Sequence, residues 1–235
     1  MSTVSVGSAA ELLQQAPNPS GLRRLEVLPG ERALTQRLGV GIVYTPVGSG
    51  SATPHHHGPA ETAVYVLDGS VGFHCGGELR ESVEAGPGAF VFIAPHAVHQ
   101  EYNPDAARPS TIVVVRDVRG SSYFPAVAPE AAPPGGTGVS VLADGLGGGA
   151  SSAQNVRLTE RTLAADERIT LDPANHETAI TVLAGAARVG ADDEPGTIGH
   201  AGQWFYLGAT TPVAVSNSGD QEARLLVVQG PLLSA

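Results

Sequence analysis

Residues 48–69 read GSGSATPHHHGPAETAVYVLDG, in which three consecutive histidines precede a glutamate and an alternating apolar run. The run at 62–68 is rich in β-branched and aromatic side chains and is followed by a glycine. Such a run is typical of a β-strand bounded by turn-forming residues. Alternate side chains of a strand share one face, so we expect His55 and His57 to converge while His56 points to the other side.

Short apolar runs between turn-forming residues continue along the whole chain. The 30 glycines and 18 prolines punctuate runs that are rich in valine, isoleucine and aromatic residues. Runs of this length and composition favour strands over helices. The sequence therefore predicts an all-β protein. The clearest runs are LGVGIVYTPV (38–47), GAFVFIAP (88–95), STIVVVRDV (110–118), GQWFYLG (202–208) and ARLLVVQG (223–230).

Two of the segments recur within the chain. ETAVYVLDG at 61–69 matches ETAITVLAG at 177–185. GAFVFIAPHAVHQEYN at 88–103 matches GQWFYLGATTPVAVSN at 202–217. Matches at a nearly constant offset indicate a duplicated structural unit. The chain is therefore predicted to be a tandem duplication.

The segment between the two copies, residues 121–138, is rich in proline, alanine and glycine. This composition is typical of a linker and unsuitable for a central strand. We therefore expect three parts: residues 1–120 with a short N-terminal extension and the first unit, the linker at 121–138, and the second unit at 139–235.

The histidines of the first copy predict a metal site. Glu61 follows His57 after a short turn, so its carboxylate can approach the point on which His55 and His57 converge. His99, at the end of the run FVFIAPHAVH, is the candidate for a fourth ligand from a neighbouring strand. Imidazoles with one carboxylate suit iron, manganese, nickel, zinc, cobalt or copper, and four protein ligands leave coordination positions open.

Charge and composition exclude several other classes of function. The formal net charge is −10, and all 13 basic residues are arginines without a cluster, so nucleic acid is not an expected partner. Without lysine, the chain cannot form a lysine Schiff base or a phosphate-binding loop of the Walker type. A single cysteine, an N-terminus unlike a secretory signal and the absence of a long apolar run predict a cytoplasmic protein with no membrane partner.

The motifs resemble those of the cupins, a superfamily of small β-barrels. The first cupin motif matches Gly50, His55, His57, Glu61 and Gly69. The second matches Gly88, Pro95, His99 and Asn103. The resemblance implies two tandem cupin barrels, each a double-stranded β-helix or jelly roll, as in a bicupin.

The two copies differ in their resemblance to the cupin motifs. In the first, seven residues separate Glu61 from Gly69 where the family usually has six, so Thr62 competes with Glu61 for the glutamate position. The family's turn glycine is replaced by His96. In the second, the positions of the three histidines hold Leu171, Pro173 and Val213, and Glu177 alone is retained. The resemblance therefore implies a metal-binding first barrel and a degenerate second barrel.

The resemblance also implies an enzyme that chelates a small oxygen-bearing substrate to one divalent transition metal per chain. Iron is the expected metal, with manganese, nickel, zinc, cobalt and copper as alternatives, and Glu61 is also a candidate general base. The expected reaction is a dioxygenation. One alternative is redox-neutral isomerase, lyase, decarboxylase or cyclase chemistry, and another is a non-catalytic small-molecule-binding bicupin. The expected partner is the small-molecule substrate, and the chain is a candidate homodimer. The candidate pocket residues are Tyr44, Tyr65, His96 and Tyr102.

Overall fold

The structure is a computed structural model, and it describes residues 4–8, 14, 16–17, 21–28, 38–49, 52–117, 138–142, 155–172, 176–191, 195–207 and 212–232. Most of those residues form strands, and none of them forms an α-helix. The first half contains β1 (Val4–Ser8), β2 (Arg23–Leu28), β3 (Leu38–Thr45), β4 (Thr62–Asp68), β5 (Val71–Cys75), β6 (Glu81–Ala85), β7 (Phe90–Ile93), β8 (Gln100–Tyr102) and β9 (Ser110–Asp117). A short 3-10 turn, η2 (Gly77–Leu79), joins β5 to β6.

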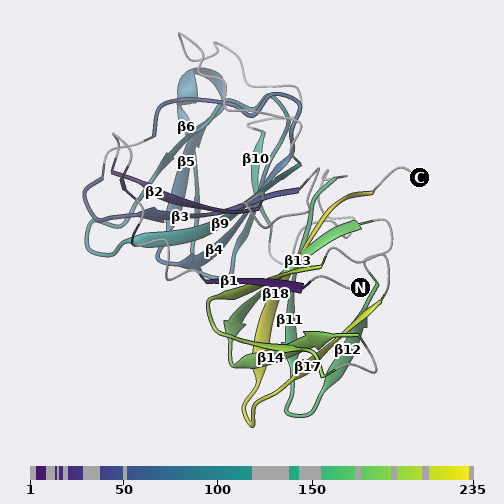
Figure 1. Cartoon of the computed structure of the whole chain (residues 1–235). Coiled ribbons are helices and arrows are strands. Elements are labelled where there is room, and N and C mark those ends of the chain that lie inside the picture. The colour runs from purple at the N-terminus through teal and green to yellow at the C-terminus, as the bar shows by residue number, and fades with distance from the viewer. Residues whose placement is uncertain are drawn as a thin grey trace.

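The second half repeats the arrangement, and most of it is shown in green and yellow in Figure 1. Its strands are β10 (Val139–Leu142), β11 (Arg157–Leu163), β12 (Arg168–Leu171), β13 (His176–Ala184), β14 (Ala186–Gly190), β15 (Thr197–His200), β16 (Gln203–Leu207), β17 (Val213–Asn217) and β18 (Ala223–Leu232).

Each half is a barrel made of one large and one small antiparallel sheet. The first barrel combines the sheet β10-β7-β4-β9-β3-β2 with the sheet β6-β5-β8. The second combines β1-β16-β13-β18-β11 with β12-β17-β14-β15. Each barrel encloses its own apolar interior, represented by Phe73 in the first and Phe205 in the second. The predicted all-β fold of two tandem jelly-roll barrels is therefore confirmed.

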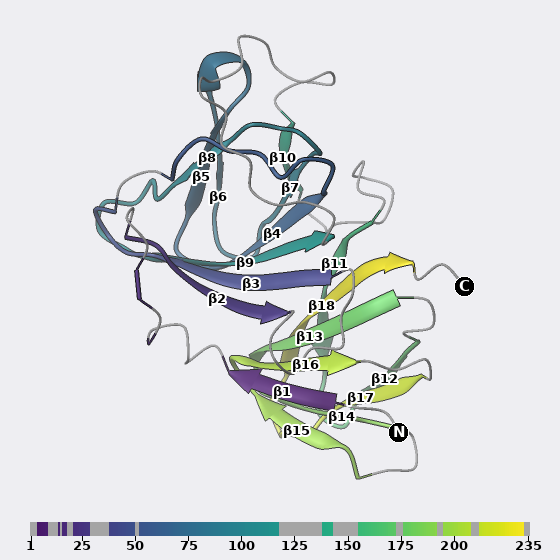
Figure 2. The ribbon, with the colours of Figure 1, turned by 45° about the horizontal axis from the view of Figure 1, so that its top comes forward.

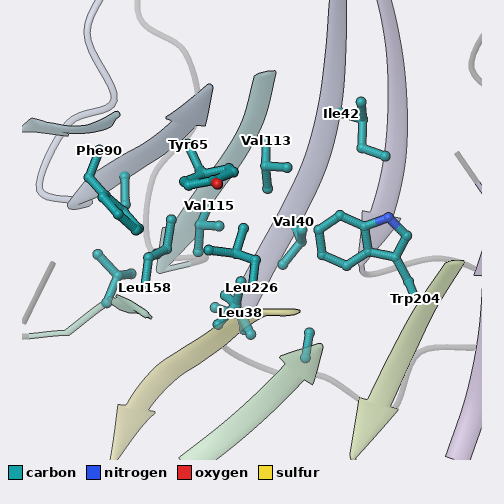
Figure 3. Close-up of a cluster of buried hydrophobic side chains, with 14 of the residues drawn as sticks. Leu38, Val40, Ile42, Tyr65, Phe90, Val113, Val115, Leu158, Trp204 and Leu226 are labelled. Carbon is teal, nitrogen blue, oxygen red and sulfur yellow. The ribbon is translucent and has the colours of Figure 1, made fainter. Parts of the chain in front are cut away.

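A third apolar cluster joins the two barrels. It combines buried side chains of the first barrel, among them Leu38, Tyr65 and Phe90, with Leu158 and Trp204 of the second (Figure 3). The two large sheets therefore pack against each other, and their outer faces form a continuous core that excludes water.

Strand alternation divides β4 between these two cores. Ala63 and Tyr65 belong to the cluster between the barrels, whereas Val64 and Val66 belong to the interior of the first barrel. Because both faces of β4 are covered, its sequence is nearly continuously apolar. This parity also determines which residues next to β4 can face the barrel interior.

The barrels exchange one strand each. β1 pairs with β16 of the second barrel, with Val4 opposite Leu207. β10 pairs with β7 of the first barrel, with Val139 opposite Ile93. Both exchanged strands begin with the tripeptide Val-Ser-Val, and Figure 2 shows β1 in purple beside the green β16. The exchange ties each half of the chain to the barrel built by the other half.

The exchange bears on the expected division of the chain. The predicted N-terminal extension contributes β1 to the second barrel, and β10, which starts at the expected boundary of the second unit, belongs to a sheet of the first. Of the predicted linker at 121–138, all but residue 138 lies outside the described part of the chain. The three-part division of the chain thus stays a prediction.

Candidate metal centre

The structure brings together His55, His57 and His99. All three are buried, and one ring nitrogen of each lies within 4.8 Å of the corresponding atoms of the other two. The centroids of the imidazole rings are 4.8 Å apart for His55 and His57, 4.6 Å for His55 and His99, and 5.1 Å for His57 and His99. The predicted convergence of the His-x-His pair with His99 is therefore observed.

The backbone on both sides fixes this cluster. His55 and His99 form an isolated antiparallel bridge in which each N–H donates to the other's carbonyl at 2.9 Å. His57 lies at the start of a tight turn, where the N–H of Ala60 donates to the His57 carbonyl at 3.2 Å. His56 points elsewhere, since its Nδ1 accepts a hydrogen bond of 3.0 Å from the N–H of Gly58.

Hydrogen bonds to the backbone orient two of the imidazoles. Nδ1 of His55 lies 2.8 Å from the carbonyl oxygen of Thr53, and Nδ1 of His99 lies 2.9 Å from that of Ala97. A carbonyl oxygen only accepts, so both Nδ1 atoms must carry the proton. The Nε2 atoms then present lone pairs to the centre, as metal-binding histidines do.

A carboxylate that the sequence analysis did not identify completes the cluster. Oε1 of Glu101 lies 3.7 Å from Nε2 of His55 and 3.6 Å from Nε2 of His99. Within the described part of the chain, the buried Nε2 of His99 has no hydrogen-bond partner. Electron-pair donors thus face one another across a short gap. A cation between them, either a proton or a metal ion, stabilises that arrangement.

Glu101 reaches this position because of strand alternation on β8. It pairs with Phe73, whose ring lies in the interior of the first barrel, while Tyr102 pairs with Gly72 on the outer face. A signal for it was present in the sequence: Glu101 is two residues after His99, and residues two apart on a strand share a face.

Burial lowers the pKa of two of the clustered imidazoles, those of His55 and His57. Burial, with the nearby positive charge of Arg116 as the next cause, lowers the pKa of His57 to about 2. Burial also lowers the pKa of His55. For Glu101, burial alone would raise the pKa, but the neighbouring His99 and His55 outweigh it and hold that pKa below its usual range. These directions favour the neutral form of His55 and His57 and the ionised form of Glu101, which are the forms in which such groups bind a divalent metal.

Arg116 and Thr62 lie beside the cluster on adjacent strands. They pair in register between β9 and β4. Ile112 and Val114 line the interior of the first barrel. Arg116 is two residues after Val114 on the same strand, so it lies on the same face. Thr62 is buried, and its hydroxyl has no hydrogen-bond partner among the described residues. A positive charge and a buried hydroxyl therefore lie on the strand faces next to the histidines.

Glu61, the fourth predicted ligand, is not brought into the histidine cluster. It has the parity of Ala63 and Tyr65, so its side chain lies on the face of β4 that packs against the second barrel. There its Oε2 accepts hydrogen bonds from the backbone N–H groups of Asn155 at 2.7 Å and Val156 at 3.3 Å. The extra residue between Glu61 and the following glycine places Thr62 on the inner face instead.

The predicted pocket tyrosines lie away from the cluster. Tyr65 is buried between the barrels and donates to Oε2 of Glu160 at 2.7 Å, and the half-buried Tyr44 packs against the same core. Tyr102 stacks on His74 with the ring centroids 4.3 Å apart, on the outer face of β5 and β8. The structure thus places these three tyrosines on surfaces other than the barrel interior.

His96 occupies an exposed turn with a φ of 61°, which is the left-handed conformation expected where the cupin motif has glycine. Its ring centroid lies 5.9 Å from that of His56. These two imidazoles lie next to the cluster along the chain, outside the group of three buried histidines.

The second barrel has apolar side chains where the first has ligands. Val213, at the position of His99, is buried in the interior of the second barrel, and Leu171, at the position of His55, packs against it. Residue 173, at the position of His57, lies outside the described part of the chain. Within the described residues, the first barrel holds the group of histidines that could bind a metal ion.

Comparisons with known proteins agree with this architecture. The sequence profile of the family described as "Cupin domain" matches residues 41–116, which include the three clustered histidines and Glu101. The first barrel is therefore similar to the cupin domain family, and the chain as a whole has a fold of two tandem β-barrels. Among curated proteins, none matches the sequence.

Solved structures with the same fold cover nearly the whole chain. Bacterial pirin YhhW from Escherichia coli, solved in complex with nickel(II), is 14% identical with a TM-score of 0.69, over 98% of this chain and 100% of that protein. Salicylate 1,2-dioxygenase from Pseudaminobacter salicylatoxidans is 15% identical with a TM-score of 0.72, over 97% of this chain and 84% of that protein. A second structure of salicylate 1,2-dioxygenase, described as adducts with gentisate, is 14% identical with a TM-score of 0.70, over 97% of this chain and 81% of that protein.

A search of the described residues for a helix with the length and apolar character needed to cross a membrane finds none.

Proposed function

We propose that the first barrel binds one divalent transition metal and acts as a metal-dependent enzyme on a small oxygen-bearing substrate. The observation that carries the proposal is the convergence of His55, His57 and His99 with the carboxylate of Glu101. Three imidazoles and one carboxylate form a donor set suited to iron, manganese, nickel, zinc, cobalt or copper. Iron is the metal that we propose for the active enzyme.

The four side chains would hold the ion inside the first barrel. The backbone bridge between His55 and His99 fixes two donors, and the carbonyls of Thr53 and Ala97 orient them. A divalent metal bound here supplies a Lewis acid for a substrate oxygen and, if ferrous, also activates dioxygen. Four protein donors leave room on a five- or six-coordinate ion for such a substrate.

The surroundings support an anionic substrate. Arg116 places a positive charge beside the cluster, and that charge contributes to the low pKa of His57. An enolate, a 2-oxo acid or a phenolate could chelate the metal while its negative charge is compensated by this arginine. The likeness to a salicylate dioxygenase and to a pirin in complex with nickel(II) supports the same class of chemistry.

For the reaction itself we propose the dioxygenation of a small-molecule substrate in the cytoplasm. The assembly of the chain as a homodimer stays a prediction. The test is elemental analysis of protein purified without a polyhistidine tag, followed by dioxygen uptake after anaerobic loading with ferrous iron. Uptake that requires both iron and a chelating phenolate or 2-oxo acid would support the proposal. Substrate turnover without dioxygen uptake would favour isomerase, lyase, decarboxylase or cyclase chemistry instead. A chain that retains no metal would contradict the proposal as a whole.

A further inference from the structure

Glu61 and Glu177 hold equivalent positions in the two halves of the chain, and each reaches across to the other barrel. Oε2 of Glu61 accepts the N–H groups of Asn155 and Val156, at 2.7 and 3.3 Å. Oε2 of Glu177 accepts the N–H of Leu38, at 2.7 Å. We propose that Glu61 is a positioning residue, through which the second barrel holds the metal-binding loop of the first barrel in place. The inference rests on the proposed metal site.

The connection between Glu61 and the histidine cluster is short, and all of it except Pro59 is buried. His57 and Glu61 are separated by a turn of three residues that the bond from the Ala60 N–H to the His57 carbonyl closes at 3.2 Å. A second bond runs from the N–H of His96 to the carbonyl of Gly58 at 2.7 Å. Ala60 is 0% exposed and Glu61 is 5% exposed, so the end of the turn next to Glu61 has little space in which to move. A displacement of Glu61 must therefore be transmitted to the His57 imidazole.

The second barrel provides a rigid partner for this carboxylate. Val156 is fully buried in the core between the barrels and directly precedes β11, which pairs with β18 along its whole length. The two N–H groups that donate to Glu61 belong to residues that precede β11. They therefore lie outside the ladder between β11 and β18, which begins at Arg157. A buried carboxylate that accepts N–H groups is held strongly, because leaving it without partners would be costly.

Glu177 provides the matched comparison within the same molecule. It has the same residue type, the same burial of 5% and the same place in the repeat, and it accepts an N–H at the start of β3. The second barrel, however, has Leu171 and Val213 where the first has His55 and His99. Both glutamates therefore contribute to docking of the barrels, whereas Glu61 alone adjoins a metal-binding loop.

A positioning role and a role as metal ligand predict different metal affinities for the variant Glu61→Gln. A positioning carboxylate can be replaced in part by an amide oxygen, which still accepts an N–H. A carboxylate that binds the metal directly cannot be replaced in this way, because a neutral amide oxygen is a much poorer donor to a divalent transition metal.

The test uses the full chain in its metal-free form and measures the binding of Co²⁺ by calorimetry and the midpoint of thermal unfolding. The variants are Glu61→Ala, Glu61→Gln, Glu177→Ala and Glu177→Gln. We expect all four to lower the unfolding midpoint. Loss of a group that hydrogen-bonds a metal ligand typically costs roughly ten- to a hundredfold in metal affinity; because Glu61 acts on His57 only through the backbone of the turn, we expect the lower end, roughly tenfold, for Glu61→Ala. Glu61→Gln should retain most of the affinity, and both Glu177 variants should bind Co²⁺ as the wild type does.

Three results would overturn the inference. If Glu61→Ala bound Co²⁺ as tightly as Glu177→Ala, Glu61 would serve barrel docking alone. If Glu61→Gln lost the metal as completely as His57→Ala, Glu61 would be a direct ligand. If the wild-type chain bound no metal, the proposed function would fail and this inference with it, which the wild-type titration distinguishes from the first two results.

Discussion

His55 and His99 exchange a pair of backbone hydrogen bonds, each 2.9 Å long, across an isolated bridge between two segments that are far apart in the sequence. Each ring is also held at Nδ1 by a carbonyl two residues earlier in the chain. The positions of two donors are thus fixed by backbone contacts that need no ion. Metal binding should therefore require little rearrangement of the first barrel.

The histidine triplet gives the first prediction. His57→Ala should abolish most metal binding, because it removes a buried imidazole from the cluster. His56→Ala should leave the metal in place, because the His56 ring accepts an N–H from Gly58 and lies outside the cluster. Elemental analysis of both variants after identical loading checks this. Equal losses would show that the alternation of the three histidines has been misassigned.

Glu101 gives the second prediction. Glu101→Gln keeps the size of the side chain but removes the charge that faces His55 and His99, so we expect metal affinity to fall by about tenfold or more. Glu84→Gln is the control, since Glu84 is exposed on β6, at the other edge of the same small sheet, and accepts a hydrogen bond from Tyr102. The two variants would be compared by calorimetric titration with Co²⁺. An unchanged affinity in Glu101→Gln would remove Glu101 from the proposed donor set.

The sequence was sufficient for the fold because its physical signals are local and repeated. Short β-branched runs bounded by glycine and proline predicted the strands, and the recurrence of 61–69 at 177–185 predicted two units of one architecture. Strand exchange lacked such a signal. Pairing of β1 with β16 and of β10 with β7 depends on which sheet edge lies nearby in space, and the shared Val-Ser-Val tripeptide is too short to indicate it.

The candidate site was predictable where alternation alone decides the geometry. His55 and His57 share a face, and their convergence with His99 follows from the two cupin motifs. The surroundings of Glu61 and Tyr65 depend on two things: the alternation of side chains along β4 and the elements that cover each face of that strand. Both residues lie on the face that the second barrel covers, and a single sequence does not reveal that barrel's position. Glu101 was missed although its spacing from His99 placed it on the same strand face.

The location of Tyr65 between the barrels gives the third prediction. Tyr65→Phe removes the hydrogen bond from the hydroxyl to Glu160, whose carboxylate still pairs with Arg224. We expect a loss of about 1 kcal/mol in the free energy of unfolding. Metal affinity and turnover should be unchanged, because Tyr65 lies in the core between the barrels. Denaturant unfolding and Co²⁺ titration check the two parts; a change in turnover alone would instead place Tyr65 in the substrate pocket.

The exchanged strand gives the fourth prediction. Removal of residues 1–8 deletes β1 and leaves the edge of β16 without its partner, so we expect a lower unfolding midpoint and concentration-dependent association through that edge. Removal of residues 1–3 is the control, because it leaves all five residues of β1 in place. Thermal unfolding and light scattering distinguish the two deletions. Identical behaviour of both would show that the pairing of β1 contributes little to the stability of the second barrel.

Arg116 gives the last prediction, which concerns the charge of the substrate. A guanidinium beside the cluster repels a metal cation and attracts an anion, so Arg116→Met should have effects of opposite sign on the two kinds of ligand. Affinity for Co²⁺ should be retained or increased, whereas the affinity of the metal-loaded protein for an anionic chelator such as a 2-oxo acid should decrease. Arg108→Met is the control, because Arg108 forms an exposed ion pair with Asp68, at 3.7 Å, and should alter neither affinity. Parallel decreases in both affinities of Arg116→Met would mean that Arg116 supports the barrel and does not select the substrate by charge.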